Sequence, residues 1–352
     1  MSKDTNTTVQ FWSEHVKQLA EGNCGLFWWD AGPDLFEYRN VSVSGDPRTN
    51  WTRYTLKKYF DGKLPLARCL SLGCGGGRLE RHLAELGTFQ RCDAYDITAG
   101  AIELAKDLAH KNGFNNIMYE LTNINTLTLP SNWYDAVWIS MAMHHFEELE
   151  HVCQQIGNTL KPDGLLILEE YVGPNRFQFP EYQKDVANLC LSLLPARYRV
   201  RDERAADREL KLPPKGAKWV TTRLIDKLKD GDLLGAMQRR LATYRARRGG
   251  QLPEKRTINF PTVSDVVAAD PTEAIRSEEI VAVLQHYFEI VEKKALGGNL
   301  LQFLLADIAG NFSQGDQQAR NFLRMLISIE ETFLSSGEFE SDFAYIVARP
   351  TI

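Results

Sequence analysis

One stretch decides the fold of this chain: Cys69-Leu70-Ser71-Leu72-Gly73-Cys74-Gly75-Gly76-Gly77-Arg78-Leu79-Glu80-Arg81. A short apolar run meets a cluster of glycines, and leucines at helical spacing follow it (Leu79, Leu83, Leu86). This order predicts a strand, a tight turn and a helix, because glycine adopts positive φ and lets a ligand approach the backbone closely. The free N–H groups of the helix would face that ligand. The turn therefore indicates a small-molecule site.

The spacing of the glycines narrows the choice of ligand. A dinucleotide fingerprint requires G-x-G-x-x-G, and Gly73 and Gly75 fit its first half. Arg78 stands where the third glycine belongs, so the pattern is G-x-G-x-G. This speaks against a nicotinamide oxidoreductase. By itself the cluster is equally compatible with a plain tight turn.

The chain around the turn alternates between strand and helix patterns. Strands are expected near 67–72, 91–96, 117–121, 134–139 and 165–171, and helices near 78–86, 98–112 and 146–160. Such alternation predicts a parallel sheet with helices on both faces, and ligands bind such sheets at the carboxyl ends of the strands. Asp96 ends the second strand, where a carboxylate can hold a ribose diol by two hydrogen bonds.

Four segments in this order resemble the class I S-adenosylmethionine-dependent methyltransferases, over about residues 66–173 and again in the C-terminal strands. Leu70–Gly77 resembles the first motif of the family, although Ser71 stands where many members carry an acid. Asp96 matches the ribose-binding acid, and Asn123 stands where the family usually has an aspartate near the adenine. The string Lys161-Pro162-Asp163-Gly164 matches the turn before the fifth strand.

The resemblance implies a fold and a cofactor. The fold is α/β: a Rossmann-like, seven-stranded, mostly parallel sheet with helices on both faces, an antiparallel last strand and a mainly helical insertion after the fifth strand. S-adenosylmethionine is the implied cofactor. The residues expected to bind it are Gly73, Cys74, Gly75, Gly77, Asp96, Ile97, Asn123, Ile124 and Ser140.

Candidate catalytic residues follow the fourth and fifth strands. His144 and His145 could take a proton from an acceptor, or one of them could cap the next helix. Of Glu169 and Glu170, one should face the site because side chains alternate along a strand, and Glu170 and Tyr171 are the candidates for binding substrate or taking its proton. The alternative is ordinary surface polarity. The Asn/Asp-Pro-Pro-Tyr/Phe motif of enzymes that methylate base amines is missing after the fourth strand.

The chain divides into four segments. Residues 1–65 are expected to form a helical, aromatic segment that packs on the core or closes over the cleft, with helices at Phe11–Ala20 and Trp51–Phe60. Residues 66–173 form the cofactor-binding core. Residues 174–276 form a helical insertion, with helices at Glu181–Pro195 and Asp226–Tyr244. Residues 277–352 complete the sheet through a helix at 277–287, a strand at 288–296, helices at 300–312 and 316–336, and a strand at 342–348.

The insertion is basic, since residues 197–248 carry sixteen Lys and Arg against seven Asp and Glu. It is either a lid that attracts an anionic substrate or a solvated helical segment.

Composition excludes several classes of protein. The 352 residues are 43% hydrophobic and 25% charged, which fits a soluble globular protein. A net charge of −5 gives no reason to expect an obligatory nucleic-acid partner. No apolar run approaches the ~18 residues of a membrane span, and the polar start has no secretory pattern. The six cysteines have no paired metal spacing, so reduced thiols in the cytoplasm and no metal ligand are expected.

The function predicted from these features is methyl transfer from S-adenosylmethionine to an oxygen or nitrogen of a small-molecule acceptor, such as a natural product, a sugar or another, possibly anionic, metabolite. Two alternatives stay open. The acceptor could be linked to a glycan or a lipid, or the chain could bind the cofactor without catalysis. The sequence does not determine the oligomeric state.

Overall fold

A computed structural model describes residues 7–9, 11–13, 27–202, 237, 241, 244, 248, 252–313 and 316–351 of the chain. The helix expected at Phe11–Ala20 is described only at residues 11–13, which are helical. Most of the helix expected at Asp226–Tyr244, and most of the basic stretch 197–248, lies outside the described residues.

The described residues form one seven-stranded sheet in the order β3-β2-β1-β4-β5-β7-β6. Strand β7 is antiparallel to β5 and β6, and the pairs among β1 to β5 are parallel. This confirms the predicted Rossmann-like sheet with its antiparallel last strand. The strands are β1 (Leu66–Leu72), β2 (Phe89–Asp96), β3 (Ile117–Leu121), β4 (Tyr134–Ser140), β5 (Leu160–Tyr171), β6 (Phe288–Ala295) and β7 (Phe343–Pro350).

Strand β5 begins earlier than the sequence predicts. Tyr134 pairs with Leu160 and Ala136 pairs with Leu165, so residues 161–164 bulge out of the ladder. A Cβ atom added at Gly164 would lie 3.0 Å from the carbonyl oxygen of Lys161, which explains the glycine at this position. The turn expected at 161–164 is therefore a bulge inside the strand.

Helices cover both faces of the sheet because each central strand is apolar on both sides. Trp138 of β4 packs on one face with α3 (Trp51–Tyr59), α4 (Arg78–Glu85) and α5 (Ala99–Lys111). Its neighbours Val137 and Ile139 pack on the other face with α6 (Leu149–Thr159) and α12 (Ile280–Tyr287). This alternation is the period-two pattern of a strand buried on both sides.

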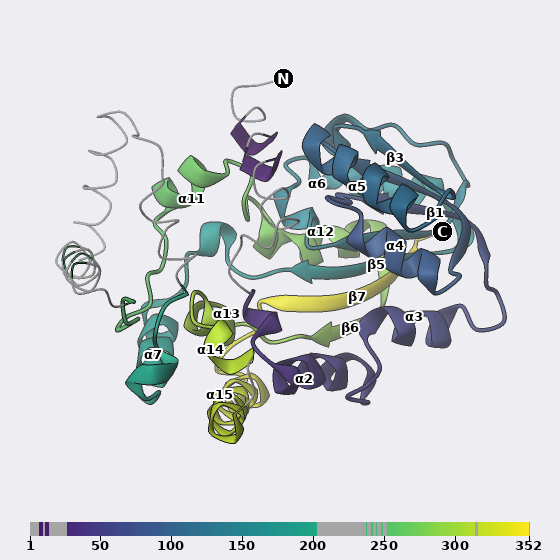
Figure 1. Ribbon diagram of the computed structural model, residues 1–352. Coiled ribbons are helices and arrows are strands. Elements are labelled where there is room, and N and C mark those ends of the chain that lie inside the picture. Colours follow the sequence, from purple (N-terminus) through teal and green to yellow (C-terminus); the bar gives the residue numbers. More distant parts are fainter. Residues whose placement is uncertain are drawn as a thin grey trace.

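Further helices gather below the β6 edge of the sheet (Figure 1), where a helix from the N-terminal part of the chain contacts one from the C-terminal part. They are α2 (Pro33–Ser44), α13 (Leu301–Leu305), α14 (Gly310–Ser313) and α15 (Gln317–Ser336). The sequence analysis does not predict α2, which begins at Pro33 and ends at Gly45 in a left-handed conformation. The single helix expected at 300–312 is two short helices, because Asp307 between them has a φ of 66°.

The carboxyl ends of β1, β4 and β5 face the side of the molecule where residues 7–13 and α11 (Val263–Ala269) lie (Figure 1). Helix α7 (Glu181–Ser192) follows the end of β5. Short 3₁₀ helices complete the described chain: η1 (Trp28–Asp30), η2 (Ile124–Thr126), η3 (Met143–His145), η4 (Asn175–Phe177), η5 (Ala196–Tyr198) and η6 (Ser277–Glu279). Among the described helices, none combines the length and the apolar character needed to cross a bilayer.

Candidate functional site

The glycine turn after β1 has the backbone that its sequence predicts. Gly73, Gly75 and Gly77 have φ values of 70°, 50° and 75°, a region that side chains with a Cβ atom disfavour. A Cβ atom at Gly73 would lie 2.3 Å from the Cβ of Ala142, and one at Gly77 would lie 2.5 Å from the hydroxyl of Tyr119. The turn therefore requires glycine for both conformation and close packing.

Hydrogen bonds from the turn to the end of β2 fix its position. The N–H groups of Gly73 and Cys74 donate to the carbonyl oxygen of Tyr95, at 2.8 and 3.1 Å. Asp96 accepts one bond at each carboxylate oxygen, from the N–H of Gly75 and of Thr98, both at 2.8 Å. Each of these oxygens keeps a further lone pair. Asp96 is half-buried, so a sugar hydroxyl can still bind it.

The next strand ends bring the other expected cofactor residues to the same edge. Leu121 at the end of β3 pairs with Asp96, which places Asn123 and Ile124 beside Ile97 at neighbouring strand ends. The side-chain oxygen of Asn123 accepts a hydrogen bond from the N–H of Asn125 at 3.1 Å. Ile97 is half-buried and Ile124 is buried.

A cavity of about 660 Å³ opens beside the glycine turn. Gly73, Cys74 and Ser140 line it, together with side chains that are not among the predicted site residues, including Trp29, Arg39, Arg78, Glu80 and Glu169. Asp96 and Asn123 are not among its lining residues. The cavity is therefore continuous with one side of the turn, whereas the ends of β2 and β3 flank the other side.

Arg39 and Glu169 form the polar wall of the cavity. The guanidinium of Arg39 pairs with Glu169 and lies 5.6 Å from the ring centroid of Trp29. The hydroxyl of Ser140 donates to the other oxygen of Glu169 at 3.2 Å. Of the two neighbouring carboxylates, Glu169 lines the cavity, although the sequence analysis selects Glu170.

Glu80 is a buried acid that the sequence analysis does not use. It is fully buried and accepts a hydrogen bond from Ser71, while its second oxygen has no partner among the described residues. Burial raises its pKa to about 7, although the Ser71 hydrogen bond opposes the shift. Ser71 is the feature of the sequence that could have indicated Glu80. Many family members carry an acid at this position of β1, and here the carboxylate of Glu80, from α4, lies beside Ser71 instead.

Glu170 lies on the opposite face from Glu169 and supports the loop after β4. Its carboxylate accepts hydrogen bonds from the N–H groups of Ala142 and Met143, at 2.9 and 2.7 Å. Its other oxygen lies 2.5 Å from Nδ1 of His144. Glu170 is 0% exposed, so its contacts are with the protein and it orients His144.

His144 and His145 have opposite electrostatic environments. Burial alone would lower the pKa of His144, but the carboxylates of Glu170 and Glu273 outweigh it and raise the pKa to about 10. Burial lowers the pKa of His145, and the neighbouring His144 adds to this shift. His144 is therefore protonated at neutral pH and His145 is neutral.

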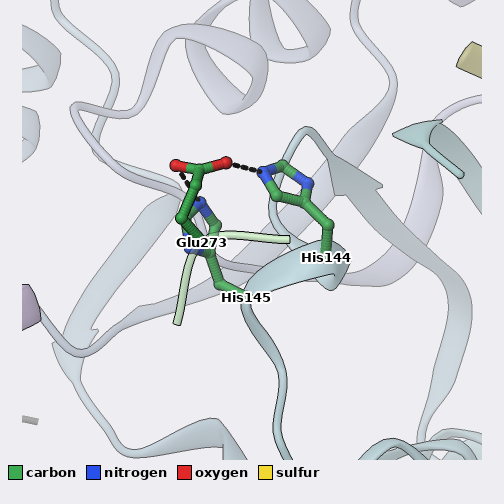
Figure 2. A group of neighbouring side chains, drawn as sticks. All are labelled: His144, His145 and Glu273. Atoms are coloured by element: carbon green, nitrogen blue, oxygen red, sulfur yellow. Dashed lines mark ion pairs between the residues drawn. The ribbon is translucent and has the colours of Figure 1, made fainter. Parts of the chain in front are cut away.

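Glu273 joins the two histidines from the loop after α11. Its two carboxylate oxygens lie 3.5 Å from Nε2 of His144 and 3.8 Å from Nε2 of His145, and Figure 2 shows both side chains converging on it. Burial would raise the pKa of Glu273, but His145 and His144 lower it to about 2. The sequence analysis does not single out Glu273, because no local pattern links it to the histidines.

Tyr171 is 1% exposed, and its hydroxyl donates to the carbonyl oxygen of Pro174 at 3.0 Å. Its ring packs against Phe177 and Phe343. These contacts make Tyr171 part of the wall behind His144.

Residues 7–9 and 11–13 cover the same edge of the sheet. Trp12 donates from Nε1 to Asp270 at 2.7 Å, and its ring contacts His145 with centroids 5.3 Å apart. The side chain of Ser13 lies 3.4 Å from where a Cβ atom would stand at Gly100. The described N-terminal residues therefore span from the start of α5 to the histidine pair.

Comparisons with known proteins match the core of the sheet. Residues 70–168 match the family model described as a methyltransferase domain. The uncharacterized methyltransferase YcgJ of Bacillus subtilis is 27% identical over 107 residues, which are 30% of this chain and 42% of that protein. The ubiquinone/menaquinone biosynthesis C-methyltransferase UbiE of Vibrio campbellii is 26% identical over 141 residues, 40% of this chain and 54% of that protein. The 27-O-demethylrifamycin SV methyltransferase of Amycolatopsis mediterranei is 29% identical over 115 residues, 32% of this chain and 42% of that protein.

The sheet order, the glycine turn and these matches define a Rossmann-like nucleotide-binding protein of the methyltransferase type. More narrowly, residues 70–168 are similar to a methyltransferase domain, which agrees with the resemblance to S-adenosylmethionine-dependent methyltransferases stated from the sequence. The alignments span between 42% and 54% of these three relatives, so the chain matches about half of the length of each.

Proposed function

We propose that this protein transfers the methyl group of S-adenosylmethionine to an oxygen or nitrogen atom of a small-molecule acceptor. One observation carries the proposal: a glycine turn tied to Asp96 lies beside a cavity of about 660 Å³. A Cβ atom at Gly75 would meet no atom within 4 Å, so the backbone of the turn is open to the close approach of a ligand at this glycine. The residues present therefore fit the cofactor.

The cofactor, when bound, supplies an activated methyl group on a sulfonium. In the proposed arrangement Asp96 and Asn123 hold its adenosine part, with Ile97 and Ile124 as apolar neighbours. Gly73, Cys74, Gly75, Gly77 and Ser140 bind its methionine part. The protein then aligns the acceptor and excludes water from the cleft, which are the main contributions such a transfer needs.

The acceptor end is proposed to lie at the histidine pair. An oxygen or nitrogen acceptor loses a proton as it is methylated, so a neutral imidazole is the useful group. His145 fits this role because its pKa is lowered and its side chain is 16% exposed. His144, held by Glu170, is a positioning residue whose protonated ring keeps the neighbouring pKa low. Glu170 and Tyr171 affect the reaction only by holding the His144 ring in place.

Three observations bear on the chemical class of the acceptor. One relative is named for C-methylation and another for a 27-O-demethylrifamycin acceptor, so the domain occurs with both carbon and oxygen acceptors. The neutral His145, which follows β4 at the same end of the sheet as the glycine turn, favours a heteroatom here. The excess of Lys and Arg in residues 197–248 favours an anionic acceptor. A glycan- or lipid-linked acceptor and a non-catalytic cofactor-binding protein are the alternatives.

The proposal is tested by calorimetric titration with S-adenosylmethionine, S-adenosylhomocysteine and NAD. We expect both adenosyl ligands to bind and NAD not to bind. Binding of NAD alone would contradict the proposal. Release of S-adenosylhomocysteine in the presence of candidate acceptors then separates an enzyme from a protein that only binds the cofactor.

Substitution of Asp96 tests the cofactor site directly. Asp96→Ala removes the carboxylate proposed to hold the ribose and also frees the N–H of Gly75, so we expect cofactor binding to weaken by at least about tenfold. The matched control is Asp107→Ala, an exposed acid on α5. Unchanged cofactor binding by Asp96→Ala would show that the site is wrongly assigned.

A further inference from the structure

Three side chains beyond the carboxyl end of β4 bring together the atoms of a metal centre. His144, His145 and Glu273 each offer one ligand atom, and these atoms lie within 4.8 Å of one another. Nε2 of His144 is 3.5 Å from one oxygen of Glu273, and Nε2 of His145 is 3.8 Å from the other. Figure 2 shows the carboxylate between the two rings. Ligands at about 2 Å from a common ion stand about 3 to 4 Å apart. The two Nε2–oxygen distances lie in this range but go to different oxygens of Glu273, so small shifts of the three side chains would bring one donor atom from each onto a common ion.

We propose that His144, His145 and Glu273 bind a divalent transition-metal ion. The donor set is two imidazole nitrogens and one carboxylate. Imidazole suits zinc, iron, cobalt and nickel, whereas magnesium and calcium prefer oxygen ligands alone. Three protein ligands also leave positions open for water or for an oxygen of a bound molecule.

The second observation is the outer layer of the cluster. A ligating histidine commonly donates its other ring N–H to a carboxylate or carbonyl, which fixes the ring and leaves the opposite nitrogen for the ion. Nδ1 of His144 lies 2.5 Å from Glu170, and Nδ1 of His145 lies 3.1 Å from the hydroxyl of Thr272 and 3.4 Å from Asp270. Both Nε2 atoms are thereby aimed at Glu273.

The outer groups are themselves anchored. Glu170 accepts two backbone N–H groups from the loop that carries the histidines. Asp270 accepts hydrogen bonds from Thr8 and from Trp12, both at 2.7 Å. A cluster held from three separate segments is organised before an ion arrives, which favours binding.

The position of the cluster suggests what the ion would do. Ala142, two residues before His144, contacts the glycine turn, so the ion would lie at the same end of the sheet as the cofactor. A metal ion lowers the pKa of a bound hydroxyl or water. Binding of the ion would displace the proton from Nε2 of His144 and occupy the lone pair of His145, so neither ring would be the base. A hydroxyl of the acceptor bound to the ion would lose its proton to water, and methyl transfer itself would be unchanged. The inference concerns ion binding and does not depend on the proposed acceptor.

The test uses the full chain, freed of metal by chelation and titrated with Co²⁺. We expect one Co²⁺ per chain by elemental analysis, a visible absorption band of nitrogen- and oxygen-ligated cobalt, and loss of that band on adding Zn²⁺. Neither cofactor nor acceptor is present, so failure here is distinct from failure of the proposed function. S-adenosylmethionine binding is measured on the same sample.

Three variants locate the ion. His145→Ala and Glu273→Gln should each weaken Co²⁺ binding by more than about 100-fold, and Glu170→Gln, in the outer layer, by about 10- to 100-fold. The matched control is His286→Ala, an exposed histidine on α12, which should bind as the parent chain does. Circular dichroism and thermal unfolding establish that each variant is folded.

Absence of stoichiometric Co²⁺ binding by the parent chain would overturn the proposal. So would unchanged binding in a folded Glu273→Gln variant, because the ion would then occupy another part of the chain. If His145→Ala does not fold, Glu273→Gln and Glu170→Gln decide the question by themselves.

Discussion

At the scale of single residues, His144 and His145 show how environment separates two identical side chains. The pKa of His144 is raised to about 10 and that of His145 is lowered, because Glu170 contacts only the first ring closely. Pairs of titratable groups whose pKa values move apart are typical of acid–base sites. We therefore expect His145→Ala to bind S-adenosylmethionine normally and to lower turnover by about 10²-fold or more.

Two quantities test this prediction in His145→Ala and in the parent chain: kcat with an acceptor that the parent methylates, and the calorimetric binding constant of the cofactor. His110→Ala, an exposed histidine on α5, is the control. Since the pKa of His145 lies below its usual value of 6.5, turnover should fall on acidification at a lower pH than it would with an unperturbed histidine as the base. Equal turnover in His145→Ala would contradict the assignment.

Glu80 gives a prediction about stability at the same scale. Its pKa is raised by burial to about 7, so the folded state holds a proton that the unfolded chain, with a pKa near 4.5, has lost. The resulting stability is full below pH 4.5 and disappears as the pH rises through 7. Glu80→Gln removes this pH dependence. The free energy of unfolding of the variant, relative to that of the cofactor-free parent, should therefore be higher at pH 8 than at pH 4.5 by about 3 kcal/mol.

Urea unfolding of parent and Glu80→Gln at both pH values measures this difference. Glu85→Gln, an exposed acid on the same helix, is the control. If the difference in the free energy of unfolding between parent and variant does not change with pH, Glu80 ionises like an exposed carboxylate.

At the scale of elements, the turn between β1 and α4 depends on glycine for two separable reasons. Gly77 and Gly87 have similar φ values of 75° and 65°, but a Cβ atom at Gly77 would meet Tyr119 whereas nothing lies within 4 Å of one at Gly87. Gly87→Ala therefore costs only the backbone strain of about 1 to 2 kcal/mol. Gly77→Ala should cost more and should also weaken cofactor binding.

Thermal unfolding and cofactor titration of the two glycine variants provide the measurement. Because Gly77 and Gly87 have similar φ values, any additional loss of stability or of cofactor binding in Gly77→Ala reports the contact with Tyr119 and the adjoining site. Equal stability and equal cofactor binding in the two variants would show that the packing at Gly77 is unimportant.

At the scale of the whole molecule, α15 holds together segments from both ends of the described chain. Glu330 is fully buried and accepts hydrogen bonds from the N–H groups of Gly298, Leu300 and Leu301, at 2.9, 3.0 and 3.0 Å. On the N-terminal side, Asp34 of α2 pairs with Arg320 and Arg324 of α15. These contacts fix the helices that border the β6 edge of the sheet.

We expect Glu330→Ala to destabilise the protein by about 3 kcal/mol or more, because it leaves three backbone N–H groups without a partner. Glu331→Ala, the exposed neighbour on the same helix, should change the free energy of unfolding by less than about 0.5 kcal/mol. Chemical denaturation measures both. Similar values for the two variants would show that water or backbone rearrangement satisfies the freed groups.

Features decided by local chemistry could be predicted from the sequence. The strands and the helices around the glycine turn follow from hydrophobic period and from glycine, whereas the seven-stranded plan is what the family resemblance implies; the structure confirms both. Helix α2 could not be predicted, since its packing against α15 depends on Asp34 meeting arginines at the other end of the chain. The break at Asp307 likewise depends on tertiary contacts and not on a helix-breaking residue.

The sequence by itself determined the class of fold and the cofactor edge, because a tight turn, an acid after a strand and an apolar period act within a few residues of one another. Only the tertiary structure decided which carboxylate meets which group. It places Glu169 in the cavity wall and Glu170 under His144, and it brings Glu80 to Ser71 and Glu273 to the histidines. Such contacts join segments far apart in the chain, and the energy that selects them is the burial and pairing of charges, which no local pattern records.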